Sequence, residues 1–233
     1  MKATSRLKVA VVIPAYNEST VIADVVSSLR STLSKSSYKF EIIVVDDGSR
    51  DNTALIARES GATVISHILN SGAGSATATG LSYAQQNNFD IAATCDADGQ
   101  HAPADVLTGI ETLSTSDIDL LIGSRLINSD GMSKVKILGN KGMTIITRVL
   151  FGINATDSQS GLRIFSKNAL EKLRWRTSGY EFCSEMLWRA NQLSLKISEY
   201  PIKAIYTDYS ISKGQNNWNA VNIVKSLLRR RLV

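Results

Sequence analysis

The chain has 233 residues, of which 43% are hydrophobic and 20% are charged. These values are typical of a globular protein and exclude a disordered or low-complexity chain. The net charge of +5 is unevenly distributed, because residues 131–156 and 209–233 contain basic but no acidic side chains. Such zones indicate either an anionic partner or a solvated surface.

The sequence contains no sign of export or of a membrane-spanning helix. The N-terminal residues lack an uninterrupted apolar core of signal-peptide length, and no stretch of about 18 consecutive apolar residues occurs. Its two cysteines, Cys95 and Cys183, are too few for a disulfide framework. We therefore expect a protein of the reducing cytoplasm.

Short apolar runs alternate with helical patterns through the first 95 residues. The runs predict buried strands at 8–14, 40–45, 63–67 and 91–95. Helices are predicted at 18–33, from 51 or 52 to about 60, and at 72–86. This alternation is typical of an α/β fold with a mostly parallel central sheet and helices on both faces.

The second half of the chain gives a weaker pattern. It predicts a helix at 103–113, a strand at 119–122, a basic segment with an apolar stripe at 136–153, a polar approach at 157–165 to a further element, a helix at 180–193, a strand pair at 196–205 broken at Pro201, and a helix at 217–232. No internal repeat or low-complexity linker separates these elements.

Three polar clusters follow predicted parallel strands, at 16–18, 46–49 and 96–98. Parallel strands bring their carboxyl ends to one edge, where ligands of such sheets bind. Asp96 and Asp98 are two residues apart and can point the same way, and Gln100 adds another oxygen. Oxygen ligands of this kind suit Mg²⁺ or Mn²⁺. The alternative is a solvated Asp-Gly turn, but the convergence of the three clusters favours a metal site.

Six segments, in this order, resemble one family of enzymes. They are PAYNE (14–18), DDGS (46–49), DADGQH (96–101), GSR (123–125), DSQSGLR (157–163) and YTDYSISKGQ (206–215). The chain is similar over residues 9–215 to the inverting family-2 glycosyltransferases of the GT-A fold, a Rossmann-like α/β fold. The last three segments resemble the branch that contains dolichol-phosphate mannosyltransferase and the bacterial polyprenyl-phosphate sugar synthases.

The resemblance implies a donor site for a UDP- or GDP-linked sugar. The nucleoside would be held by Pro14, Tyr16, Glu18 and Asp46, with Asp47 adjacent; the metal on the diphosphate would be held by Asp96, Asp98 and Gln100; and Lys213 would close over the diphosphate. His101 is a weaker candidate ligand. The alternatives are a helix-stabilising acid for Glu18 and an ordinary surface side chain for Lys213.

The resemblance also implies an acceptor site, where Arg125, Ser160 and Arg163 would bind the phosphate of a dolichyl or undecaprenyl phosphate. Arginine forks pair bidentately with phosphate oxygens, although structural salt bridges would also explain them. Such an acceptor is already anionic and needs no general base. Glu185 lies where relatives with hydroxyl acceptors keep a base, and it is a candidate acceptor-site residue here. The resemblance as a whole gives four candidate catalytic residues: Asp98, Arg125, Arg163 and Glu185.

A polyprenyl phosphate lies in a bilayer, which a peripheral enzyme on the cytoplasmic face of the membrane would have to reach. We assign residues 1–216 to the catalytic domain and 217–233 to a basic amphipathic helix. This helix and the segment 134–153 could bind an anionic leaflet or could pack on the core or on a partner subunit.

Two other functions are consistent with part of the pattern. One is a family-2 transferase whose acceptor is a saccharide or protein hydroxyl, for which Glu185 would be essential. The other is a non-catalytic module that binds sugar nucleotides or nucleic acid. Aromatic residues that could stack on bases are sparse in the basic zones, which argues against nucleic acid.

Overall fold

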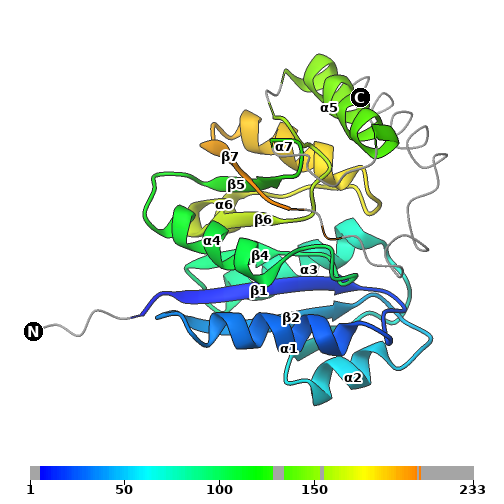
Figure 1. The fold of residues 1–233 in the computed structure, drawn as a ribbon. Helices are drawn as coiled ribbons and strands as arrows, with labels where there is room; N and C mark the ends of the chain where they lie inside the picture. Colours follow the sequence, from blue (N-terminus) through cyan, green and yellow to red (C-terminus); the bar gives the residue numbers. More distant parts are fainter. Residues whose placement is uncertain (1–5, 128–133, 153–154, 204, 206–233) are drawn as a thin grey trace, which may run out of the picture.

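The structure is a computed structural model that describes residues 6–127, 134–152, 155–203 and 205. One seven-stranded sheet with the order β3-β2-β1-β4-β6-β5-β7 forms its centre (Figure 1). The strands are β1 (Lys8–Ala15), β2 (Lys39–Asp46), β3 (Thr63–Ser66), β4 (Ile91–Thr94), β5 (Leu120–Ser124), β6 (Arg163–Ser166) and β7 (Ile197–Pro201).

Six of these strands run in the same direction, and β6 alone is antiparallel to both of its neighbours. The carboxyl ends of the six strands and the amino end of β6 therefore meet at one edge of the sheet. The register places Arg163, the first residue of β6, beside Thr94 of β4 and Ile122 of β5. The sheet topology thus brings a residue from late in the chain next to the carboxyl end of β4.

Helices cover both faces of the sheet (Figure 1). Their bounds are α1 (Ile22–Leu33), α2 (Thr53–Glu59), α3 (Ala73–Gln86), α4 (Pro103–Ser114), α5 (Lys134–Phe151), α6 (Lys167–Lys172) and α7 (Phe182–Gln192). Buried side chains of α1, α2 and α4 form one hydrophobic layer with the sheet, and those of α3, α6 and α7 form the other.

Strand β1 shows why two layers form. Its side chains alternate across the sheet, so that Val9 and Val11 join the α1–α4 layer while Ala10 and Val12 join the α3–α7 layer. All four are fully buried. Helix α3 lies close to β1 because it has Gly80 there: a Cβ atom at this position would lie 2.2 Å from Val12 Cγ1. A larger residue would separate the helix from the sheet.

The first 114 residues follow the predicted alternation closely. Helix α1 begins at Ile22 rather than at Glu18, because residues 18–21 form a turn in which the Val21 and Ile22 amides both donate to the Glu18 carbonyl. The second half differs more. Strand β6 and helix α6 were not predicted, and β7 ends at Pro201 without a second strand among the described residues that follow it.

Candidate active site

The three polar clusters predicted from the sequence do converge at the carboxyl edge of the sheet. Tyr16 follows β1, Asp46 ends β2, and Asp96 follows β4. Arg125 follows β5, the neighbour of β6, whose first residue Arg163 starts at the same edge. The site is therefore assembled from five strands that lie side by side in the sheet (Figure 1).

The turn 96–101 is shaped by its own side chains. Asp98 accepts two hydrogen bonds from Gln100, one from the backbone amide (3.0 Å) and one from the side-chain nitrogen Nε2 (2.7 Å). Gly99 has a φ of 76°, a left-handed conformation that favours glycine. The predicted ligand Gln100 thus contacts Asp98 directly and supports the carboxylate.

The Asp96 carboxylate lies against Gly161. A Cβ atom at Gly161 would be 2.3 Å from Asp96 Oδ1 and 2.7 Å from Oδ2, so only glycine leaves room for the carboxylate. The Gly161 carbonyl is held in turn by the Thr94 hydroxyl at 2.8 Å. The Asp96 side chain remains 47% exposed, which leaves it accessible to a ligand.

The charges at this turn are suited to a bound cation. Desolvation by the surrounding protein raises the pKa of Asp96, although the positive charges of Arg125 and Arg163 oppose the shift. Desolvation also raises the pKa of Asp98, and the neighbouring charge of Asp96 adds to the effect. Both carboxylates are therefore harder to ionise than usual, and a bound cation would offset this effect.

The donor set agrees with a hard divalent ion. Among the described residues, no group of three or more His, Cys, Asp and Glu side chains is arranged to hold a metal. Two carboxylates, with substrate phosphates and water completing the shell, are nevertheless the usual protein contribution to Mg²⁺ sites. The residues present therefore fit such an ion.

His101 orders the same turn. Its Nδ1 accepts a hydrogen bond from the Asp96 backbone amide at 3.2 Å, and its Nε2 lies 3.8 Å from Asp96 Oδ2. Burial, supported by the charge of Arg125, lowers the pKa of His101 to about 4. The ring is therefore neutral near pH 7, and its proton is on Nε2 because Nδ1 accepts a hydrogen bond.

The residues predicted to hold the nucleoside lie at the ends of β1 and β2. Tyr16 is 38% exposed, Pro14 and Glu18 are half-buried, and Asp46 is buried. The Glu18 backbone amide donates to Thr53 Oγ1 at 2.8 Å. The structure thus brings these predicted residues to one region, while their contacts with a nucleoside remain a prediction.

Asp47 differs from the other predicted donor residues. It is buried, and its carboxylate accepts hydrogen bonds from the backbone amides of Ser71 (2.9 Å) and Gly72 (2.7 Å). His67 Nδ1 lies 2.7 Å from the same carboxylate. Asp47 therefore holds the loop between β3 and α3 in place.

The predicted acceptor residue Arg125 forms a bidentate ion pair. Its Nε is 2.7 Å from Asp157 Oδ2, and a terminal nitrogen is 2.9 Å from Oδ1. Burial acts to raise the pKa of Asp157, but the hydrogen bonds and charge of Arg125 outweigh it and hold this pKa below its usual value. Glu199 of β7 accepts hydrogen bonds from the backbone amides of Thr156 and Asp157, which fixes the segment.

Arg163 is buried, with 1% of its surface exposed. Its guanidinium donates to the backbone carbonyls of Ser158 (2.9 Å), Ser160 (3.0 Å) and Cys183 (3.0 Å) and to the sulfur of Met186. No carboxylate of the described residues lies within salt-bridge distance of it. The positive charge of Arg163 is therefore held beneath the site by carbonyl dipoles, and it reaches Asp96 through its field.

Ser160 and Glu185, the remaining predicted acceptor residues, are also buried. Ser160 Oγ has no hydrogen-bond partner within the described part of the chain. Glu185 accepts hydrogen bonds from the backbone amides of Arg176 (3.0 Å) and Thr177 (2.9 Å). Lys213 and the helix predicted at 217–233 lie outside the described residues.

Three residues at the site were not singled out from the sequence. Asp157 and Gly161 lie inside the DSQSGLR segment, so their motif was found but their individual roles were not. Tyr180 precedes α7; desolvation raises its pKa, and the negative charges of Asp96 and Asp98 add to the shift. Tyr180 stands between Gly179 and Glu181, outside the six segments that carry the resemblance.

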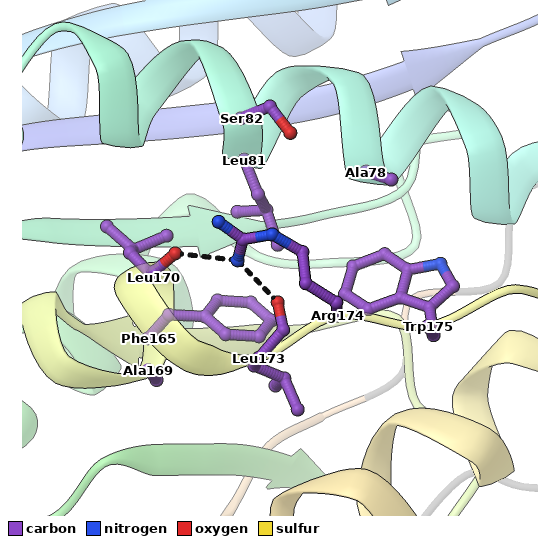
Figure 2. Close-up of a pocket in the computed structure, with 9 residues that line it drawn as sticks. All are labelled: Ala78, Leu81, Ser82, Phe165, Ala169, Leu170, Leu173, Arg174 and Trp175. Atoms are coloured by element: carbon purple, nitrogen blue, oxygen red, sulfur yellow. Dashed lines mark hydrogen bonds between the residues drawn. The ribbon is translucent and has the colours of Figure 1, made fainter.

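A small pocket of about 40 Å³ lies between α3 and α6, away from these residues (Figure 2). Apolar side chains such as Leu81 and Phe165 line it, and Arg174 lies over it. The Arg174 guanidinium donates to the carbonyls of Leu170 and Leu173 at the end of α6. A cavity of this size holds about one water molecule, so it is not a substrate site.

Helix α5 exposes an apolar stripe. Leu138, Ile145 and Val149 are 74%, 60% and 71% exposed, and their spacing places them on one face. Lys141 and Arg148 on the same helix are exposed as well. Within the part of the chain that the structure describes, no helix has the length and apolar character needed to cross a bilayer.

The fold is that of the GT-A class of glycosyltransferases. Residues 10–174, well over half of the chain, match the model of glycosyl transferase family 2, and the chain belongs to this family.

Individual relatives agree with this assignment. The chain is 40% identical over 230 residues to an uncharacterized protein of Methanocaldococcus jannaschii, covering 97% of this chain and 93% of that protein. It is also 40% identical over 244 residues to the UDP-N-acetylglucosamine–dolichyl-phosphate N-acetylglucosaminyltransferase of Methanococcus voltae, covering 95% of each chain.

A solved structure shows the same fold. Glucosyl-3-phosphoglycerate synthase from Mycobacterium tuberculosis, in complex with Mn²⁺, UDP and glucosyl-3-phosphoglycerate, superposes with a TM-score of 0.71 at 22% identity, covering 97% of this chain and 80% of that one. The predicted family and fold class are thus confirmed.

Proposed function

We propose that this glycosyltransferase moves a sugar from a nucleotide-linked donor to the phosphate of a polyprenyl phosphate. The observation that carries the proposal is the placement of Arg125, which follows β5, and Arg163, which begins β6 beside Thr94, at the same edge of the sheet as the acidic turn of Asp96 and Asp98. A site with adjacent acidic and basic parts suits a metal-bound diphosphate on one side and an anionic acceptor on the other. The M. voltae relative, named for transfer to dolichyl phosphate, supports this acceptor class.

In this proposal Asp96 and Asp98 hold Mg²⁺ or Mn²⁺, with Gln100 supporting Asp98. When bound, the ion would stabilise the negative charge that develops on the leaving nucleoside diphosphate. Pro14, Tyr16, Glu18 and Asp46 position the nucleoside. The Asp96 carboxylate lies against Gly161 and its backbone amide is held by His101, so the turn that carries the carboxylate is ordered before substrate arrives.

Arg125 is the acceptor-binding cation of this proposal. It is partly exposed, and its guanidinium is oriented by both oxygens of Asp157. Arg163 is buried, so it contributes a positive field below the acceptor phosphate. Ser160, whose hydroxyl has no hydrogen-bond partner among the described residues, lies in the same segment. A phosphate dianion attacks without a general base, which agrees with the engagement of Glu185 by two backbone amides.

We further propose that the protein works peripherally on an anionic cytoplasmic leaflet through α5. The exposed Leu138, Ile145 and Val149 can enter the interface between headgroups and acyl chains, and each nearby Lys or Arg contributes roughly 1 kcal/mol of attraction to anionic lipid.

The transferase reaction is tested with a panel of UDP- and GDP-sugars, dolichyl and undecaprenyl phosphate, and Mn²⁺ or Mg²⁺. We expect one donor to give a lipid product whose mass equals the polyprenyl phosphate plus one sugar residue, and we expect EDTA to abolish it. Transfer to a saccharide or protein hydroxyl in place of the lipid would contradict the proposal. A further control is Asp98→Ala, for which full activity would contradict the metal role.

A further inference from the structure

We infer that Asp47 and Glu185, which resemblance places in the donor and acceptor sites respectively, are positioning residues at the two ends of one clamp. The clamp consists of Asp47, the turn 71–74, the segment 175–178 and Glu185. It joins β2 on the donor side of the sheet to α7 on the acceptor side. This inference rests on the proposed function only for its effect on nucleotide binding, because the clamp itself is defined by contacts.

The first end of the clamp is Asp47, which follows β2. Its backbone amide donates to the Ala15 carbonyl at 2.8 Å, which ties it to the end of β1. Its carboxylate accepts from the amides of Ser71 and Gly72 at 2.9 and 2.7 Å. Because both carboxylate oxygens bind the turn before α3, Asp47 is oriented towards the protein backbone.

The middle of the clamp is a close contact between two backbone segments. The Gly74 amide donates to the Ser178 carbonyl at 2.7 Å. A Cβ atom at Gly72 would lie 2.4 Å from the Ser178 carbonyl oxygen, and one at Gly74 would lie 2.5 Å from the Thr177 carbonyl oxygen. Only glycines allow this approach, so the position of the turn depends on where the segment 177–178 lies.

Trp175 adds a second bond at this contact. Its indole Nε1 donates to the Gly74 carbonyl at 3.0 Å, and the ring packs against Phe182 of α7 with centroids 5.7 Å apart. In Figure 2 this ring lies beside Arg174, at the end of the pocket between α3 and α6. The segment is thus fixed to both α3 and α7.

The second end is Glu185 of α7, whose carboxylate accepts the amides of Arg176 and Thr177. Arg176 and Thr177 lie outside any helix or strand, so their amides need acceptors from elsewhere. The buried Glu185 carboxylate supplies both acceptors. Arg189 Nε lies 3.7 Å from one of its oxygens, which balances the charge. Removing the negative charge would free one amide and loosen the segment that seats the turn 71–74.

Glu185 as part of the clamp and Glu185 in direct contact with the acceptor are two hypotheses that predict different results for Glu185→Gln. As a direct acceptor residue or a general base, Glu185 would affect acceptor binding or the pH dependence of turnover, and it would leave nucleotide binding unchanged. As part of the clamp, it supports the loop beside Asp46 and Tyr16, so nucleotide binding weakens when no acceptor is present. Glutamine keeps one oxygen that can still accept a hydrogen bond from one of the two backbone amides. Its side-chain NH₂ group would face the other amide N–H, so that hydrogen bond is lost.

The experiment measures UDP and GDP affinity by calorimetry with saturating Mn²⁺ and no acceptor. We expect Glu185→Gln and Asp47→Asn each to weaken binding of the preferred nucleotide roughly tenfold. The double variant should be weaker by less than the product of the two factors, since both act on one turn. Glu171→Gln and Asp24→Asn, at exposed positions on α6 and α1, are matched controls expected to bind as wild type. Wild-type nucleotide affinity in Glu185→Gln would overturn the clamp.

Hydrogen exchange tests the clamp without nucleotide. The amides of residues 71–74 should exchange faster in Glu185→Gln than in wild type, and unchanged exchange there would overturn the inference. If Glu185→Gln does not fold, Trp175→Phe takes its place, with an expected two- to threefold loss of nucleotide affinity and faster exchange at 71–74; wild-type values for both would overturn the clamp. If the wild-type protein binds neither UDP nor GDP, the proposed function fails and the exchange measurement still decides the clamp.

Discussion

The acidic turn at Asp96 shows how much of the site depends on single residues. The Asp96 carboxylate lies against Gly161, and the Asp96 backbone amide donates to the neutral ring of His101. Neither Gly161 nor His101 offers a charge to the substrate. They determine instead where the charge of Asp96 lies, which is what preorganised metal and diphosphate binding requires.

Gly161→Ala is expected to weaken metal-dependent nucleotide binding. The added Cβ would lie 2.3 Å from Asp96 Oδ1, so the carboxylate must move. A displacement of this kind costs on the order of tenfold or more in affinity. Calorimetric titration of UDP or GDP with and without Mn²⁺ measures the effect.

The matched control is Gly139→Ala on α5, where a Cβ would meet no atom within 4 Å. This variant should bind nucleotide as wild type does and should gain slight helix stability. Equal nucleotide affinity in the two variants would show that the contact between Gly161 and Asp96 does not position the metal site.

Asp157→Asn is expected to destabilise the fold and to impair acceptor use. Asp157 is fully buried, and its replacement leaves Arg125 facing a neutral amide. The free energy of unfolding should fall by about 2–3 kcal/mol, a value that allows for the partial exposure of Arg125. The KM for polyprenyl phosphate should rise while donor affinity stays near wild type. Chemical denaturation and steady-state kinetics measure the two effects.

The same pair predicts a pH dependence. The pKa of Asp157 is lower in the folded state than its ordinary value of 3.8. The stability that the ionised Asp157 adds to the folded state is therefore complete above about pH 4, and it is lost as the pH falls through the lowered pKa. Asp157→Asn should remove this part of the acid sensitivity, whereas Asp117→Asn, at an exposed ion pair with Lys196, should leave it unchanged. An identical acid profile in wild type and Asp157→Asn would rule out the linkage.

At the scale of elements, the strands and helices up to residue 114 were predictable because each has a clear local signal. Strand β4 is a continuous apolar run, and α4 begins at Pro103 with a helical stripe behind it. Strand β6 has no such signal: its four residues begin with Arg163, and it is a strand because β4 and β5 pair with it on both sides. Local propensity does not encode a strand that depends on two partners.

Helix α5 is the element on which the membrane proposal depends. Ile145→Glu places a negative charge in the exposed apolar stripe, so it should reduce co-sedimentation with vesicles containing 30% anionic phospholipid several-fold at low salt. Leu55→Glu on α2 is the control, because Leu55 is exposed to a similar degree but lies outside α5. Equal losses in the two variants, or no vesicle binding by the wild type, would refute the assignment to α5.

At the scale of the whole molecule, the sheet order explains why the motifs could be grouped from the sequence while their contacts could not. Parallel topology places Tyr16, Asp46 and Asp96 at one edge, and this follows from alternation alone. The partners of Arg125, Arg163 and Glu185 do not follow from it, because they depend on how the segments 156–160 and 175–178 pack. The sequence therefore predicted that Tyr16, Asp46 and Asp96 lie at one edge, but not that Arg163 and Glu185 would bond to backbone atoms.

The predicted donor residues and the predicted acceptor residues lie in different halves of the sheet. The predicted donor residues lie in or directly after β1, β2 and β4, and the predicted acceptor arginines follow β5 and begin β6. The clamp from Asp47 to Glu185 crosses between these halves at the carboxyl edge. We propose that the half of the sheet with β5 and β6 is built to bind a phosphate acceptor and not a hydroxyl acceptor.

The most direct test compares a polyprenyl phosphate with the polyprenol of the same chain length, which differs only by the phosphate. With the preferred nucleotide-sugar and Mn²⁺, we predict release of nucleoside diphosphate and formation of a sugar–phosphate–lipid with the phosphate acceptor alone, and loss of this activity in Arg125→Ala. Comparable transfer to the polyprenol, or full activity of Arg125→Ala with polyprenyl phosphate, would contradict the account.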